Sequence, residues 1–305
     1  MSRRTQNKSH VRAMLLALAA VPLLLVLCAA LQVRIDAETR LMDPDKGELL
    51  LRSGWLLKKL SLGYEPLVAD IYWTRVVQYY GRRARKVGAT YESLWPLLDI
   101  TTTLDPKLMI AYRFGAVFLS EEPPVGPGRA DLAVDLVKRG IAENPEEWRL
   151  YQDLGFLYSI HLKDYQKAAD AYLEGSKNPN AQIWMKVMAA RVAEAGNSPE
   201  TSRLIWIEVY ANSKDELVRR RATQHIHSLD AALGLKKLNG SSEDYWRKFG
   251  RFPTSVQELR AAGLVGGALQ DPEGYPYVMG PNGVPQLNPK SPIVLDPDQG
   301  SEKLR

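Results

Sequence analysis

The sequence predicts an all-α protein: a solenoid of stacked helical hairpins, preceded by a transmembrane helix and followed by a small C-terminal α+β appendage. Three observations lead to this prediction. Residues 13–31 form an apolar run without a charged side chain. Between residues 64 and 238, apolar residues recur at helical spacing in segments bounded by proline and glycine. After Ser241 the pattern changes to turn and strand signals.

Charge placement argues against a nucleic-acid-binding protein. The chain has 40 basic and 35 acidic residues, giving a formal net charge of +5. Four of the basic residues, Arg3, Arg4, Lys8 and Arg12, lie in the tail at residues 1–12, so the remaining chain is close to neutral. The only cysteine, Cys28, lies in the apolar run. A disulfide framework and a cysteine-based metal site are therefore both excluded.

The N-terminal segment predicts the compartment. As a helix, residues 13–31 would span about 28 Å, close to the thickness of a bilayer core. The basic tail before it favours a single-pass protein of a bacterial inner membrane, with a cytoplasmic N-terminus and a periplasmic C-terminal domain. A removed signal peptide is an alternative, with cleavage after Ala30 yielding a secreted or periplasmic protein. Lipid attachment at Cys28 is disfavoured because Leu27 before it is too large.

The first hairpin follows a mixed-charge linker at residues 32–63, in which residues 49–60 are a candidate short helix that would rest on the membrane surface or on the first hairpin. Residues 64–81 have helical periodicity and end at Gly81, and residues 91–105 form a second helical segment that ends before Pro106. Aromatic residues crowd the first of these helices, and at helical spacing they indicate core more often than a ligand platform. These aromatic residues are Tyr72, Trp73, Tyr79 and Tyr80.

The next hairpins carry a repeated spacing of small and large residues. Between Pro145 and Pro179, the residues Tyr151, Leu154, Gly155 and Tyr158 precede a second group, Ala168, Tyr172 and Gly175. In the hairpin before it, Ala111, Phe114, Gly115 and Phe118 precede Ala133, Val137 and Gly140. Residues 120–128 add a proline- and glycine-rich loop between those two helices. A weaker copy begins near Met185, and a long helix ending near residue 238 is expected to cap the array.

This spacing resembles the tetratricopeptide (TPR) repeat family over about residues 64–238. The resemblance implies that the protein binds another protein or peptide through a groove lined by the first helix of each repeat. Mapped onto this chain, the partner-binding residues are Met109, Tyr112, Ala116, Leu119, Arg149, Gln152, Phe156, Ser159, Ile183 and Lys186, followed by Ala190 and Ala193. Their apolar and aromatic character favours an amphipathic helix or an extended apolar segment as the partner. The alternative is that the capping helix or the appendage fills the groove.

Residues 241–289 are similar to the C-terminal part of type II secretion major pseudopilins. The likeness rests on a helix, the run Gly250-Arg-Phe-Pro-Thr254, and the turn Asp271-Pro-Glu-Gly274 followed by a hairpin turn at residues 281–283. The N-terminus has neither the processing site nor the glutamate of a pilin subunit. In that family this region binds calcium; here Asp271, Asp296 and Asp298 would be the only obvious oxygen ligands, and a calcium site is disfavoured. Residues 290–305 are expected to form a flexible tail.

No sequence motif indicates catalysis. The chain lacks the short motifs of zinc proteases, α/β-hydrolases, P-loop proteins and dinucleotide-binding proteins, and we expect no enzymatic activity, cofactor or metal. The sequence therefore predicts a membrane-anchored scaffold of the bacterial envelope. An accessory component of a secretion or pilus-like machine, assembled through the appendage, is the alternative, and an enzyme with an unrecognised site is a weaker one. The oligomeric state is left open.

Overall fold

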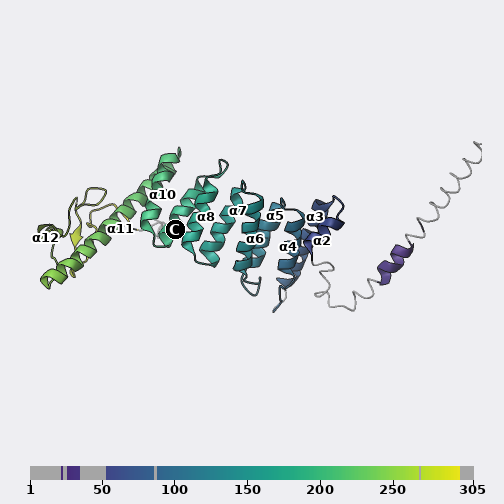
Figure 1. The fold of residues 1–305 in the computed structure, drawn as a ribbon. Coiled ribbons are helices and arrows are strands. Elements are labelled where there is room, and N and C mark those ends of the chain that lie inside the picture. Colours follow the sequence, from purple (N-terminus) through teal and green to yellow (C-terminus); the bar gives the residue numbers. More distant parts are fainter. Residues whose placement is uncertain (1–21, 23–25, 35–52, 86–87, 268, 296–305) are drawn as a thin grey trace, which may run out of the picture.

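A computed structural model describes residues 22, 26–34, 53–85, 88–267 and 269–295. These residues are mostly helical, which confirms the all-α prediction at that level. The helices stand side by side in an elongated row that ends in a long slanting helix and a small sheet (Figure 1).

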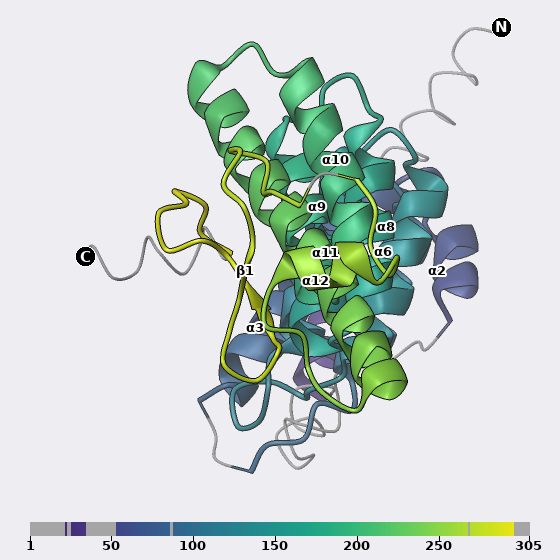
Figure 2. The ribbon, with the colours of Figure 1, turned by 90° about the vertical axis from the view of Figure 1, so that its left-hand side faces the viewer.

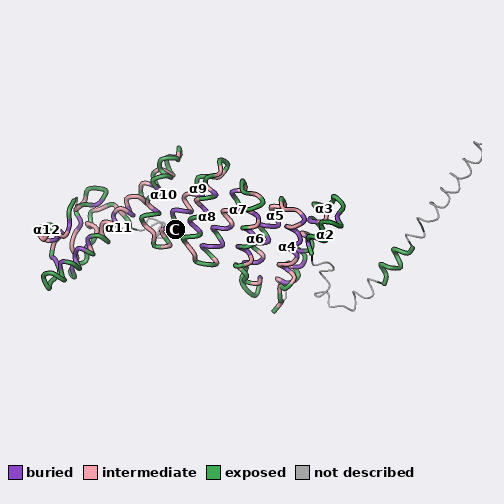
Figure 3. The backbone as a smooth tube through the Cα atoms, viewed as in Figure 1, coloured by how far each residue is buried: buried purple, intermediate pink, exposed green. Residues whose placement is uncertain are grey.

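The row is built from short helices in chain order. They are α2 (Gly54–Leu60), α3 (Glu65–Arg83), α4 (Leu94–Leu104), α5 (Met109–Ser120), α6 (Ala130–Glu143), α7 (Trp148–Phe156), α8 (Tyr165–Ser176), α9 (Trp184–Ala195) and α10 (Pro199–Asn212). Each helix from α3 onward packs against the next one, so neighbours in the chain are neighbours in space. Buried residues are spread through the helices of the row, and many turns at its edges are exposed (Figure 3).

Glycines at the helix crossings allow the close packing. A Cβ atom built on Gly155 of α7 would lie 2.7 Å from the ring of Tyr172 on α8. A Cβ on Gly115 of α5 would lie 2.5 Å from a methyl group of Leu98 on α4. Real Cβ atoms do not approach neighbours so closely, so these positions need a residue without a side chain.

Asparagines tie one hairpin to the next at the junctions between them. The side-chain amide of Asn144 donates to the carbonyl of Pro106 at 2.8 Å, and that of Asn178 donates to the carbonyl of Glu146 at 2.6 Å. Each of these asparagines precedes a proline. Proline has no backbone N–H group, so it needs no hydrogen-bond acceptor at the start of the following segment. The junctions are therefore held by side-chain hydrogen bonds, and the hairpins follow one another in a fixed arrangement.

Helices α7 and α8 are joined by a wide turn. Helix α7 continues into a π-helical segment, η1 (Leu157–His161), before Lys163 adopts a positive φ of 54°. In a π turn each backbone hydrogen bond spans five residues, against four in an α-helix. The turn therefore accommodates one additional residue within the helix. Helix α8 then begins after Asp164, whose carboxylate accepts the amide of Lys167 at 3.1 Å.

Two predicted boundaries are corrected by this arrangement. The predicted linker at residues 32–63 contains α2, which packs against α4 and so belongs to the row. Helix α11 (Glu216–Phe249) runs without a break through residues 238–241, where the sequence indicated a change of segment. The long helix is the element shared by the row and the appendage.

The appendage has a core of its own at the far end of α11. Leu238 and Tyr245 of α11 pack with Leu259 of α12 (Val256–Ala261) and with Tyr277. Strands β1 (Val278–Met279) and β2 (Pro285–Gln286) pair antiparallel beside it. The end-on view shows α12 and this hairpin lying along α11 (Figure 2).

The predicted membrane segment lies largely outside the described residues. Of residues 13–31, residues 22 and 26–31 are described and are helical, and the helix continues to residue 34 with exposed side chains. Residues 1–12 and the linker from 35 to 52 also lie outside the described part, as do residues 296–305. Among the described residues, no helix has the length and apolar character needed to cross a bilayer.

Candidate binding face

The ten predicted partner-binding residues fall into three environments. Arg149, Phe156 and Ile183 are exposed, and Met109, Gln152 and Lys186 are half-buried. Tyr112, Ala116, Leu119 and Ser159 are buried, as are the additional residues Ala190 and Ala193. The prediction that all ten residues line an accessible face is therefore wrong for the four buried residues.

Tyr112 is a core residue. Its side chain is fully buried, and its ring lies against Gly140 of α6, where a built Cβ would come within 2.9 Å. Burial raises the pKa of the Tyr112 phenol to about 12. A partner cannot contact this ring without opening the contact between α5 and α6.

The exposed side of α5 presents a different set of apolar residues. Ile110, Phe114 and Val117 are 43%, 53% and 47% exposed, and Phe118 beside them is half-buried. The same kind of surface continues on α3 through Trp73, Val77 and Tyr80, and on α7 and η1 through Phe156 and Ile160. We call this set the first-helix face.

Ring contacts join α3 and α5 across this face. Phe118 stacks on Tyr80 with 4.1 Å between ring centroids and on Trp73 with 6.1 Å. Phe114 contacts Phe118 at 6.5 Å. These contacts hold the rings in place, so the face is a preformed aromatic surface whose outer members remain accessible.

An ion pair joins α5 and α7. Arg113 Nε donates to Asp153 Oδ2 at 2.6 Å, and Arg113 Nη2 donates to the second oxygen at 3.2 Å. Phe114 follows Arg113 directly, and Phe156 lies three residues after Asp153, so each aromatic residue is close in sequence to one partner of the bridge. Burial raises the pKa of Asp153, and the Arg113 guanidinium opposes that shift.

A pocket adjoins the α3 and α5 end of the face. It has a volume of about 570 Å³ and is lined by Tyr91, Trp95, Leu119 and Pro127, among others. Tyr91 contacts Tyr80 of the first-helix face at 5.9 Å, and its hydroxyl donates to the carbonyl of Val125 in the predicted loop at residues 120–128. That loop therefore forms one wall of a pocket at the edge of the aromatic surface.

Sequence reasoning placed Phe114 and Phe118 among the packing residues and missed their part in this face. A usable signal was the high density of aromatic residues in two consecutive first helices, at 72–80 and 114–118. Tyr72 and Tyr79 are indeed core, being 6% and 1% exposed, whereas Trp73 and Tyr80 belong to the face.

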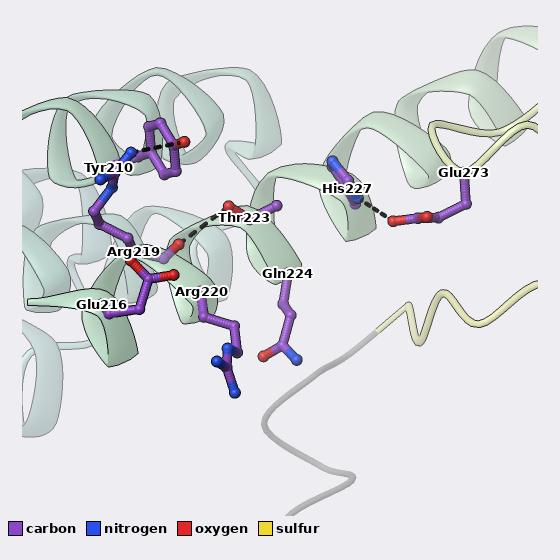
Figure 4. Close-up of a pocket in the computed structure, with 8 residues that line it drawn as sticks. All are labelled: Tyr210, Glu216, Arg219, Arg220, Thr223, Gln224, His227 and Glu273. Atoms are coloured by element: carbon purple, nitrogen blue, oxygen red, sulfur yellow. Dashed lines mark hydrogen bonds and ion pairs between the residues drawn. The ribbon is translucent and has the colours of Figure 1, made fainter.

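A second pocket, of about 300 Å³, lies where α10, α11 and the appendage meet (Figure 4). Arg219 donates to the hydroxyl of Tyr210 at 2.9 Å, while Arg220 and Gln224 point together into open space. His227 contacts Glu273 of the appendage at 2.7 Å. Two arginines and two glutamates line the pocket, so its charges balance and it selects neither anions nor cations by net charge.

Of the three carboxylates considered for calcium, only Asp271 lies in the described part of the chain. Asp271 is 3% exposed, and its Oδ1 accepts the amides of Glu273 and Tyr275 at 3.0 and 2.9 Å. Its Oδ2 accepts the hydroxyl of Ser291 at 2.5 Å. Asp296 and Asp298 lie outside the described part of the chain. Within that part, no three potential metal ligands cluster.

Comparisons with known proteins add no assignment. No family model, no curated protein and no solved structure matches this chain.

Proposed function

We propose that this protein is a membrane-tethered, TPR-like scaffold that binds another envelope protein through its first-helix face. The observation that carries the proposal is the preformed aromatic surface on α3 and α5, together with Phe156 on α7, which the Arg113–Asp153 bridge joins to α5; Phe114 and Phe156 are each about half exposed. Contiguous exposed apolar surface is typical of sites that bind proteins or membranes. Aromatic anchors commonly supply most of an interface's energy.

The partner segment that fits this face is apolar and either helical or extended. The ring surface offers wide apolar contact, and Arg113 with Asp153 supplies a polar bridge between its two halves. The adjoining pocket of about 570 Å³ is large enough for a bulky side chain at one end of the segment. This combination of a broad apolar surface and a terminal pocket suits the helix-in-groove mode of recognition.

Tethering to the inner membrane comes from the apolar run at residues 13–31, with the rest of the chain in the periplasm. We expect a reporter that works only outside the cytoplasm to be active when fused after Arg305. The mature chain should begin at its encoded N-terminus. Mass spectrometry that finds a chain starting at Leu31 would replace the tether with a removed signal peptide.

The test of the binding face is a comparison of two double variants. Phe114→Ala with Phe156→Ala should weaken partner capture at least tenfold, which corresponds to about 1.4 kcal/mol. Leu204→Ala with Ile207→Ala is the matched control, since these residues are 62% and 38% exposed on α10. Affinity capture from detergent-solubilised membranes, quantified by mass spectrometry, reports both. Equal capture by the two variants would exclude the first-helix face as the binding site.

A second function is favoured by exposed aromatic residues on the appendage. Trp246, Phe249 and Phe252 are 50%, 48% and 44% exposed, and Trp246 stacks on Phe252 at 6.1 Å. This surface suits an accessory component of a secretion or pilus-like machine that assembles through its C-terminal segment. Deleting residues 251–305 removes Phe252 and the rest of the appendage, keeps Trp246 and Phe249 on α11, and tests whether the C-terminal segment is needed for assembly. Loss of partner capture on deletion, with capture kept by the Phe114 and Phe156 variant, would favour the machine component.

A further inference from the structure

The turn between α2 and α3 exposes a leucine in a strained backbone conformation. Leu62 has a φ of 50° and is 85% exposed, and Gly63 follows with a φ of 94°. Left-handed backbone is unfavourable for a branched side chain and costs glycine nothing. A leucine at this position therefore gains nothing from packing and carries a conformational cost, which points to a use outside the fold.

Neighbouring side chains give the turn an interfacial character. Trp55, Leu60, Tyr64 and Leu67 are 63%, 58%, 68% and 58% exposed. Lys58 and Lys59 lie among them on α2, and the Lys59 ammonium sits 3.8 Å from the ring centre of Trp55. Tryptophan, tyrosine, leucine and lysine together are the residues favoured where a bilayer meets water.

The base of this corner is anchored in the row. Leu57 is buried, and Gly54 lies so close to Thr103 of α4 that a built Cβ would come within 2.9 Å. The Ser61 hydroxyl donates to the Leu57 carbonyl at 2.7 Å, and the Tyr64 amide donates to the Ser61 carbonyl at 2.8 Å. The corner is thus anchored in the row, while Leu62 at its tip is 85% exposed among the described residues.

We propose that the corner at residues 55–67 contacts the lipid bilayer at its headgroup boundary, with Leu62 inserted and the two lysines on anionic lipids. The inference rests on the proposed tether, because residues 35–52 link the corner to the N-terminal helix. That link reaches at most about 65 Å when fully extended. The contact would fix the first-helix face at a set height above the membrane.

Three single-cysteine proteins test the proposal in the full chain. The first keeps native Cys28 as a reporter of the tether. The second carries Cys28→Ala with Leu60→Cys, and the third carries Cys28→Ala with Leu204→Cys as a control of similar exposure, 58% against 62%. Each is labelled with an environment-sensitive fluorophore and reconstituted into phosphatidylcholine vesicles containing phosphatidylglycerol. Nitroxide-bearing lipids then quench any label that lies in the bilayer.

We expect several-fold more quenching at residue 60 than at residue 204, and most of it should be lost when Leu62→Asp is added. Equal quenching at 60 and 204, or no effect of Leu62→Asp, would overturn the proposal. Such a result would mean that linker residues, a protein partner or a second copy covers the corner. Quenching at Cys28 without quenching at 60 leaves the tether standing and the corner contact refuted. Quenching at 60 without quenching at Cys28 supports the contact and refutes the tether.

Discussion

Single glycines set how closely the hairpins pack, and this can be measured at Gly155. Because a Cβ there would lie 2.7 Å from the Tyr172 ring, we expect Gly155→Ala to cost about 1–3 kcal/mol of unfolding free energy. Gly81→Ala is the control, since Gly81 is helical and nothing lies within 4 Å of its built Cβ. That change should be neutral or stabilise by up to about 1 kcal/mol. Urea titration followed by circular dichroism compares the two, and equal effects would contradict the packing described.

Burial separates Tyr112 from Phe156, although the sequence grouped them together. Tyr112 is fully buried, so Tyr112→Ala should destabilise the protein by about 3–5 kcal/mol. Phe156 is 48% exposed, and Phe156→Ala should change stability by less than about 1 kcal/mol. The same titration measures both variants. A large loss of stability from Phe156→Ala would show that this ring is part of the core.

The reason for the mistaken assignment is the composition of α5. Its sequence, MIAYRFGAVFLS, is apolar on almost every side, so periodicity cannot show which side faces the neighbouring helices. Helix α7 has Arg149, Gln152 and Asp153 on one side, and there the prediction of an exposed Phe156 is correct. Residue patterns thus predict the exposed side of a helix only where polar residues mark it.

At the scale of elements, α12 is held to α11 by one carboxylate with several donors. Glu258 accepts hydrogen bonds from Thr254 Oγ1 at 2.6 Å and from Arg251 Nη1 at 2.9 Å, and Tyr245 Oη on α11 donates to it at 3.1 Å. The Thr254 hydroxyl, followed by the Arg251 guanidinium, lowers the pKa of Glu258 from 4.5 to about 2. These hydrogen bonds therefore join α12 to α11 only while the Glu258 carboxylate is ionised.

The sign of its pH dependence follows from the lowered pKa. The stabilisation is fully present above pH 4.5 and is lost as the pH falls towards about 2. Over this range the Glu258 carboxylate becomes protonated and can no longer accept all of its native hydrogen bonds. We expect the α12 amides to lose protection from hydrogen exchange over this range. In Glu258→Gln the same amides should already exchange faster than in the native chain at neutral pH. Their protection should then not fall further between pH 4.5 and 2. An unchanged acid response in the variant would assign the effect to another group.

Element existence was easier to predict than element extent. The helices from α3 to α10 follow from apolar periodicity and from prolines and glycines at their ends. The continuity of α11 does not, because Gly240, Ser241 and Ser242 weaken the helical signal in the sequence. Contacts distant in sequence compensate: Ser242 Oγ donates to the carbonyl of Gly283 at 2.6 Å, and Ser241 Oγ donates to that of Leu264 at 3.1 Å.

At the scale of the whole molecule, two separate cores predict two separate unfolding events. The core of the row extends along α11 as far as Leu229, and the core of the appendage begins at Leu238. Leu136→Ala and Leu259→Ala each remove a fully buried leucine, and each should cost about 2–5 kcal/mol in its own core. In an array of nearest-neighbour contacts, damage in one part leaves distant parts folded.

Hydrogen exchange in increasing urea, resolved by peptide, tests this separation. Leu259→Ala should expose only peptides from the appendage at lower urea, and Leu136→Ala only peptides from the row. If either variant shifts both sets equally, the two cores unfold as one cooperative unit.

The unbroken helix α11 has a mechanical meaning. Its 34 residues form a rod about 51 Å long. One part of the rod packs in the core of the row, and the other part packs in the core of the appendage. A rod of this kind transmits bending and rotation through its ladder of backbone hydrogen bonds, whereas a flexible linker would dissipate them. A force on the appendage is therefore transmitted along α11 to α10, and a rotation of the row changes the position of the appendage. Of the two glycines in α11, Gly234 packs against Tyr277, whereas nothing lies within 4 Å of a Cβ built on Gly240, and the hydrogen bonds of Ser241 and Ser242 to the appendage offset the low helix propensity there.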